Sequence, residues 1–180
     1  YGLTQALLHA TALSRKETMA EVIAREYGST ISKKPIPILA SGHRDEWLQL
    51  DRIILKRVEL LPHASFNVVK DHIGEKGEKL HAFVKRVAGR VKEIVKIDLP
   101  RPRDATDYRP TIHVDVYGTL GELCNMQIEP MVDYIGTLKD AAAPYSLLVE
   151  SPIIAATQQA QIDAFKEARA LLKKKGIAVG

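Results

Sequence analysis

Two acidic residues, Asp115 and Glu150, are the strongest candidates for a chemical role in this sequence. Asp115 closes the run Ile112-His113-Val114-Asp115, and Glu150 closes Leu147-Leu148-Val149-Glu150; a turn signal follows each. The stretch between them reads as a helix with its loops, so both acids should end strands of one parallel sheet and meet at the same rim. Carboxylate oxygens are the ligands that Mg²⁺ prefers, so the pair predicts a divalent metal site.

Each acid also has a simpler interpretation. Asp115 alone could be a turn acid with satisfied hydrogen bonds, and Glu150 alone could be a charge near a helix N-terminus. Their matching positions at strand ends favour the metal. His63 follows another apolar run, Leu60-Leu61-Pro62, and could be a structural or a catalytic imidazole. His113 should point away from the face of its two neighbours, and we expect it to pack against a helix.

The elements that would position these residues alternate between strand and helix. Helical periodicity follows each apolar run, most clearly from Leu80 to Val95. This alternation predicts a parallel sheet, four βα units and the opening of a fifth at Gly176–Val179. The expected strands are Ile36–Ala40, Val58–Leu61 (ended by Pro62-His63), Thr111–Val116 and Ser146–Val149.

The fold class is therefore α/β, and we expect a partial (β/α)8 TIM barrel of about four βα units. An open doubly wound sheet is the competing architecture, but no glycine-rich phosphate loop follows the first strand. The pattern of residues 1–34 predicts two helices. The second helix begins with a capping box at Thr18–Glu21 and ends at Gly28. We assign residues 1–34 to the helical end of a capping domain and residues 35–180 to the half barrel. A helix is already under way at Tyr1, so we expect the chain to be a piece of a longer protein.

Composition narrows the function classes. The chain has 180 residues, 46% of them hydrophobic and 27% charged, with a formal charge of +4. Lys173–Lys175 end a helical pattern without interleaved aromatic residues, so we expect no nucleic-acid partner. The chain contains no apolar run of membrane-spanning length, so we expect no membrane partner. The single cysteine, Cys124, excludes an internal disulfide, fits a reducing compartment and reads as a packing residue.

Five runs of the sequence are informative together: Tyr1–Leu8, Ile54–Lys56, Leu61–Ala64, Gly74–Leu80 and His113–Thr119. In type and in order along the chain, they closely resemble the 3-methylaspartate ammonia-lyase family of the enolase superfamily. The resemblance implies a cytoplasmic homodimer that requires Mg²⁺, with K⁺ as activator. It also implies a small-molecule amino-acid substrate, L-threo-3-methylaspartate, which is converted to mesaconate and ammonia.

The resemblance further implies roles for individual residues. It makes Asp115 and Glu150 the first two of three Mg²⁺ ligands, and His63 the catalytic and substrate-binding histidine. The third ligand and the lysine base would lie on the fifth and sixth strands, beyond Gly180. One position departs from the pattern: Ser41 lies near where the family carries a substrate-contacting glutamine. It is the other candidate substrate-binding residue.

Other functions stay open at this point. The chain could belong to another enolase-superfamily enzyme, such as a cycloisomerase-like or racemase-like protein. It could also be a non-catalytic half barrel that binds partners through its exposed sheet edges. Without a third ligand and a lysine base, we expect these 180 residues alone to be inactive.

Overall fold

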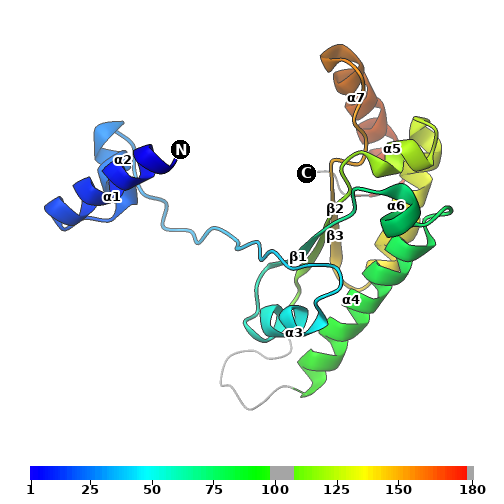
Figure 1. Ribbon diagram of the computed structural model, residues 1–180, viewed down its shortest axis with the longest axis horizontal. Helices are drawn as coiled ribbons and strands as arrows, with labels where there is room; N and C mark the ends of the chain where they lie inside the picture. The colour runs from blue at the N-terminus through cyan, green and yellow to red at the C-terminus, as the bar shows by residue number, and fades with distance from the viewer. Residues whose placement is uncertain (98–107, 178–180) are drawn as a thin grey trace. The chain divides into compact units, whose positions relative to one another are not determined.

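The structure is a computed structural model that describes residues 1–97 and 108–177 (Figure 1). It is a mixed α/β arrangement that divides into two compact units, Tyr1–Ile36 and Pro37–Gly180. Within the described residues, no helix has both the length and the apolar character that crossing a bilayer requires. The α/β class predicted from the sequence is confirmed.

The second unit is built on a parallel sheet of three strands. These are β1 (Leu60–Ser65), β2 (Thr111–Asp115) and β3 (Ser146–Glu150), in the order β1-β2-β3. The register aligns Asp115 with Glu150 at the carboxyl ends of β2 and β3. The sequence therefore predicted β2 and β3 to within one residue.

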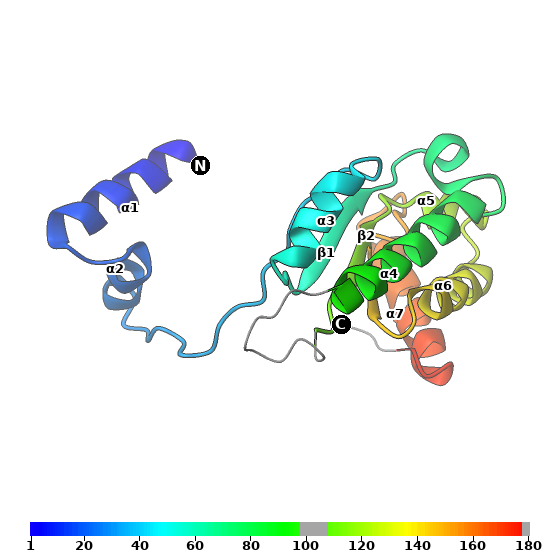
Figure 2. The same cartoon turned by 90° about the horizontal axis from the view of Figure 1, so that it is seen from below.

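Helices cover one face of this sheet (Figures 1 and 2). Helix α3 packs against β1, α4 against β2 and α6 against β3, while α7 packs against α6. A short helix, α5, and a π-helical turn, η1, lie in the loops. The bounds are α3 (Trp47–Leu55), η1 (Val69–Ile73), α4 (Glu78–Ile97), α5 (Thr119–Leu123), α6 (Ile128–Ala142) and α7 (Gln158–Lys174).

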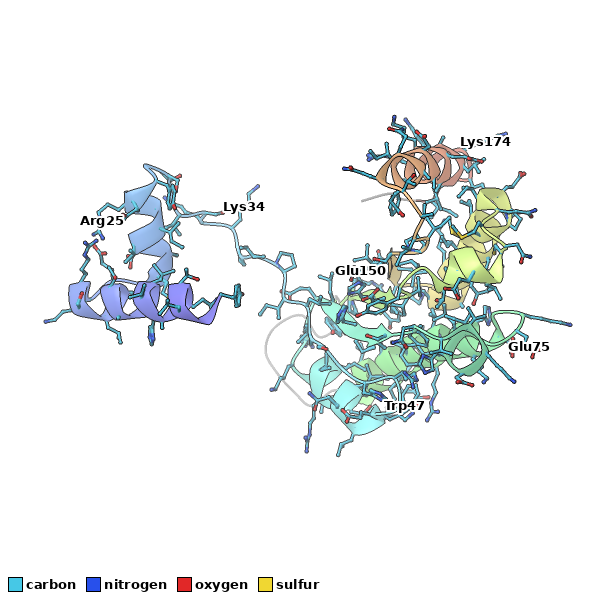
Figure 3. All side chains as sticks on the ribbon, turned by 45° about the horizontal axis from the view of Figure 1, so that its top comes forward. Arg25, Lys34, Trp47, Glu75, Glu150 and Lys174 are labelled. Atoms are coloured by element: carbon cyan, nitrogen blue, oxygen red, sulfur yellow. The ribbon has the colours of Figure 1, made fainter. Side chains whose placement is uncertain are left out.

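Helical spacing on α4 accounts for the centre of the core. Leu80, Val84, Val87 and Val91 recur at three- and four-residue intervals and are fully buried. They belong to the same apolar cluster as Ile112, which points from β2 toward the helices. At the edge of this cluster the guanidinium of Arg86 lies over the ring of Trp47 (Figure 3), 3.7 Å from the ring centroid, in a cation–π contact.

Two of the predicted strands differ from the structure. The expected strand Ile36–Ala40 is only a single bridge between Leu39 and Leu60. The Ile38 amide donates to the Glu59 carboxylate at 3.0 Å instead of to a backbone carbonyl, so the ladder does not continue toward Ile36. The expected end at Pro62-His63 is also wrong, because β1 continues to Ser65. The second half of the predicted strand opening at Gly176–Val179 lies outside the described residues.

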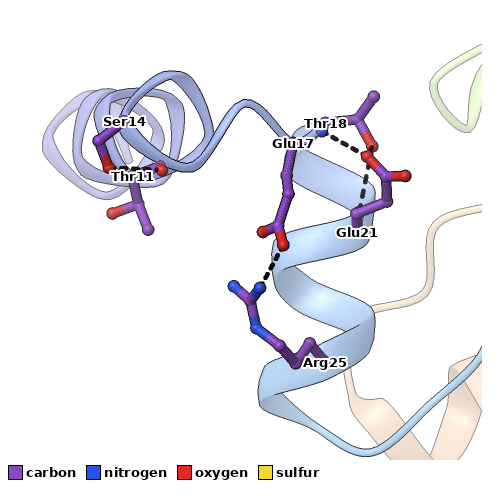
Figure 4. Close-up of polar contacts among 6 residues, drawn as sticks. All are labelled: Thr11, Ser14, Glu17, Thr18, Glu21 and Arg25. Carbon is purple, nitrogen blue, oxygen red and sulfur yellow. Dashed lines mark hydrogen bonds and ion pairs between the residues drawn. The ribbon is translucent and has the colours of Figure 1, made fainter.

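The first unit contains helices α1 (Gly2–Arg15) and α2 (Met19–Glu26). The predicted capping box is confirmed (Figure 4): the Thr18 hydroxyl accepts from the Glu21 amide at 3.2 Å, and the Glu21 carboxylate accepts from the Thr18 amide at 2.6 Å. Glu17 and Arg25 form an ion pair beside it. Local sequence signals are therefore enough to explain where α2 begins.

Candidate functional site

A β-bulge places His63. The register of β1 against β2 shifts between Pro62 and Ala64, so His63 has no partner of its own on β2. Its φ of 46° lies in the left-handed region, which a residue with a side chain rarely adopts. Bulges of this kind re-aim a side chain and are frequent beside functional sites. Here the bulge directs the imidazole of His63 toward β2 and β3.

Three side chains from three strands meet at this point. His63 Nδ1 lies 3.3 Å from His113 Nδ1 and 3.7 Å from Glu150 Oε2. His113 Nε2 lies 2.9 Å from the same Glu150 oxygen. One potential ligand atom from each residue lies within 4.8 Å of the other two. We call His63, His113 and Glu150 the strand-end cluster; Glu150 is labelled in Figure 3.

His113 corrects the expectation that it packs against a helix. It does point away from its two neighbours, but the face that it occupies is that of His63 and Glu150. Only 2% of its surface is exposed. Burial, and then the neighbouring His63, lower the pKa of His113 below its usual value, while Glu150 and Asp115 oppose that shift. The net effect favours the neutral imidazole.

The two predicted metal ligands lie on neighbouring strands, as expected from their positions. Asp115 and Glu150 are partners in the register of β2 and β3, so their side chains leave the same face of the sheet. Asp115 is 5% exposed, and its Oδ1 is 3.4 Å from the Tyr117 amide nitrogen. The Glu150 side chain is 47% exposed. Asp115 is not a member of the strand-end cluster.

The backbone after each acid turns in the same way. Tyr117 follows Asp115 and Ser151 follows Glu150, and both have φ values near 50°, in the left-handed region. The two loops are joined by a hydrogen bond of 2.7 Å from the Gly118 amide to the Ser151 carbonyl. The carboxyl ends of β2 and β3 are thus held together by their own exit loops.

Ser41 and His63 line the same cavity, which has a volume of about 460 Å³. Its wall also includes Arg44, Gln49 and Asn67. The loop that carries Ser41 is anchored to β1, because the Gly42 amide donates to the Pro62 carbonyl at 2.6 Å. The structure therefore brings the two candidate substrate-binding residues together.

Sequence reasoning missed His113 as a member of the site. The available signal was strand alternation: His113 and Asp115 are two residues apart and must share a face. From the sequence, Asp115 is placed on the face that binds the metal but His113 is expected to pack against a helix, although the two residues must share one face. Applying the same alternation to both residues would have placed His113 in the site.

The parallel sheet has helices on one face and acids and histidines at the carboxyl ends of its strands. This arrangement is typical of α/β proteins whose functional groups lie at the carboxyl edge of the sheet. Comparison with known proteins identifies the family within this class. The family model for the methylaspartate ammonia-lyase C-terminus matches residues 30–180, and the model for the N-terminus matches residues 1–28. The chain belongs to the methylaspartate ammonia-lyase family.

Individual relatives agree. The methylaspartate ammonia-lyase of Clostridium tetanomorphum is 41% identical over 177 residues, and methylaspartate ammonia-lyase 2 of Carboxydothermus hydrogenoformans is 38% identical over 179 residues. Each match covers 98–99% of this chain and 41% of the relative. The chain therefore spans about two fifths of the length of these relatives.

Solved structures show the same similarity. A magnesium complex of β-methylaspartase from Clostridium tetanomorphum superposes with a TM-score of 0.81 at 39% identity, over 97% of this chain and 40% of that one. The Citrobacter amalonaticus enzyme containing (2S,3S)-3-methylaspartic acid also has a TM-score of 0.81, at 34% identity. It covers 98% of this chain and 41% of that one.

Proposed function

We propose that this chain is part of a Mg²⁺-dependent carbon–nitrogen lyase that releases ammonia from L-threo-3-methylaspartate and forms mesaconate. The observation that carries the proposal is the register of Asp115 and Glu150 at neighbouring strand ends, with His63 beside them, in a member of this family. The proposed architecture is the first half of an enolase-type (β/α)8 barrel after the end of a capping domain. We also propose that the protein containing this chain is a cytoplasmic homodimer that is activated by K⁺.

Asp115 and Glu150 are the residues that would hold Mg²⁺. Their donor set fits this ion, because both offer carboxylate oxygens and Mg²⁺ binds through one or two carboxylates while keeping other positions for substrate and water. Asp115 supports the assignment further, since its carboxylate is almost buried and the hydrogen bond that it accepts from the Tyr117 amide is long, at 3.4 Å. When bound, the ion supplies positive charge beside the substrate carboxylate.

His63 would bind the substrate. Its imidazole lines the cavity and lies 3.7 Å from the Glu150 carboxylate, so it can donate to a substrate carboxylate close to the metal ligands. Ser41 reaches the same cavity and would contact the substrate near the position where the family resemblance implies a glutamine. A hydrogen bond that strengthens as charge builds on that carboxylate lowers the barrier to proton removal.

The elimination breaks a C–H and a C–N bond and forms the double bond of mesaconate, so it needs a base. The described residues that line the cavity include no lysine. We therefore propose that the base and a third metal ligand come from outside these 180 residues, and that the segment alone does not catalyse the reaction.

The test uses a protein that contains this chain and follows mesaconate formation by ultraviolet absorbance, with and without Mg²⁺. We expect Mg²⁺-dependent turnover, and we expect His63→Ala to lower turnover on the order of 100-fold with little change in melting temperature. His9→Ala, on the exposed surface of α1, is the matched control. Turnover that survives metal chelation, or that His63→Ala leaves unchanged, would contradict the proposal.

A further inference from the structure

We infer that the strand-end cluster binds a divalent transition-metal ion of the Zn²⁺ class through His63, His113 and Glu150. This ligand set differs from the Asp115–Glu150 pair proposed for Mg²⁺ and shares only Glu150 with it. The inference goes beyond the proposed function, because it assigns a second type of metal to the strand ends and gives His113 a role.

The spacing of the ligand atoms fits a small ion. Bonds of about 2.0–2.1 Å at tetrahedral angles separate neighbouring ligand atoms by roughly 3.3 Å. A single ion takes one nitrogen from His113. His113 Nε2 lies 2.9 Å from Glu150 Oε2, His63 Nδ1 lies 3.7 Å from that oxygen, and one ligand atom from each residue lies within 4.8 Å of the other two. His113 can offer either ring nitrogen, and the side chains of His63 and Glu150 are 25% and 47% exposed, so both have room to adjust.

His113 supplies an independent observation. Its Nε2 atom is buried and has no hydrogen-bond partner of acceptable geometry among the described residues, although Glu150 lies 2.9 Å away. A buried polar atom without a hydrogen bond destabilises the folded state. This nitrogen faces Glu150, so an ion bound between the two residues would satisfy it.

The chemistry of the donors decides the type of ion. Two imidazoles and one carboxylate are the protein ligands of catalytic zinc sites that keep a fourth position open. Imidazole nitrogen suits Zn²⁺ and its neighbours in the first transition row, whereas Mg²⁺ takes oxygen ligands. The same edge of the sheet therefore offers a nitrogen-rich set to one kind of cation and an oxygen set to another.

The cluster and the proposed Mg²⁺ pair compete for Glu150. An ion held by the cluster would also occupy His63, the residue proposed to bind the substrate. If the proposed function holds, Zn²⁺ would therefore inhibit ammonia release by removing both groups. This consequence rests on the proposed function, but binding of the ion to the cluster does not.

The test titrates Co²⁺, a spectroscopic substitute for Zn²⁺, into the metal-free protein that contains this chain. The readouts are the visible absorption of the bound ion and calorimetry with Zn²⁺. We expect one ion per chain with nitrogen ligation. His63→Asn and Glu150→Gln should each weaken binding at least about tenfold, and His9→Asn should leave it unchanged. Both cluster variants change partly exposed side chains and should fold, which circular dichroism would verify.

Asp115→Asn separates this site from the Mg²⁺ site. We expect it to change Co²⁺ affinity by less than about threefold while it weakens Mg²⁺ binding. If Asp115→Asn weakens Co²⁺ as much as His63→Asn does, the ion sits on the Mg²⁺ ligands and the inference is overturned. Co²⁺ affinity that is the same in His63→Asn and Glu150→Gln as in the unmodified protein would overturn it as well. Mesaconate formation is measured separately, so failure of the proposed function would be seen independently.

Discussion

On β2, successive residues face different environments. Ile112 and Val114 point toward α4 and α6 and are completely buried among apolar side chains. His113 and Asp115 occupy the other face, where His113 meets His63 and Glu150. The helix-covered face is held by packing, while the polar face is held by the strand register and a bulge. Substitutions on the first face should therefore change stability, and substitutions on the second face should change binding and turnover.

Truncation on the helix-covered face should have the largest effect. Ile112→Ala removes a fully buried side chain from the centre of the core, which should cost about 2–5 kcal/mol in the free energy of unfolding. Leu148→Ala is the control on the opposite face, where the side chain is 38% exposed, and it should cost less than about 1 kcal/mol. Urea unfolding of both variants measures the contrast. Equal costs would mean that the two faces do not differ in packing.

On the polar face, Asp115→Asn should affect metal binding and activity. Asp115 is a proposed Mg²⁺ ligand, so loss of its charge should weaken Mg²⁺ binding and reduce turnover by about 100-fold or more, with the melting temperature nearly unchanged. Asp140→Asn, an exposed acid on α6, serves as the control. Calorimetric Mg²⁺ titration and the mesaconate assay provide the measurements. Unchanged magnesium dependence in Asp115→Asn would make Asp115 a structural acid.

A substitution at Gly77 would test how tightly the loop before α4 packs against Tyr134 of α6. Its φ is +82°, and an added Cβ would lie 2.3 Å from the ring of Tyr134, whose hydroxyl donates to the Gly77 carbonyl at 2.6 Å. Gly77→Ala should therefore destabilise the fold by about 1–3 kcal/mol. Gly89→Ala, in the open middle of α4, should stabilise it by about 0.5–1 kcal/mol. Thermal unfolding compares them, and a stabilising Gly77→Ala would contradict the predicted clash.

The smallest effect concerns an ion pair at the margin of the core. Asp51 accepts from Arg90 Nε at 2.6 Å and from Nη2 at 2.7 Å, and these hydrogen bonds lower the pKa of Asp51 below its usual value. The stabilisation is therefore present at neutral pH and is lost as the pH falls through the lowered pKa of the folded state. Asp51→Asn should reduce the melting temperature by roughly 1–3 °C at neutral pH, because the pair is partly exposed.

The pH dependence of that difference is the second measurement. The melting temperatures of Asp51→Asn and the unmodified protein should converge below the ordinary carboxyl pKa of about 4. Glu93→Gln removes the more exposed partner of Arg90 and should have the smaller effect at neutral pH. A difference that stays constant down to strongly acidic pH would show that Asp51 acts through something other than its charge.

Much of this protein follows from local sequence. The capping box at Thr18 and Glu21, the apolar spacing along α4 and the ends of β2 and β3 at Asp115 and Glu150 are all readable from residues close in the chain. These features depend on hydrogen bonds and periodicities that span a few positions. They were sufficient to predict an α/β fold with two acids at the carboxyl edge of its sheet.

Only the tertiary structure decided which residues join those acids. The bulge that re-aims His63 depends on how β1 pairs with β2, and the contact between His63 and His113 joins residues 50 positions apart. Neither feature has a local signature, because strand register is set by packing across the whole sheet. The short edge at Leu39 was decided in the same way, since the Ile38 amide is taken by the Glu59 carboxylate, 21 positions away. The acids could be located from the sequence, but the imidazoles around Glu150 required the fold.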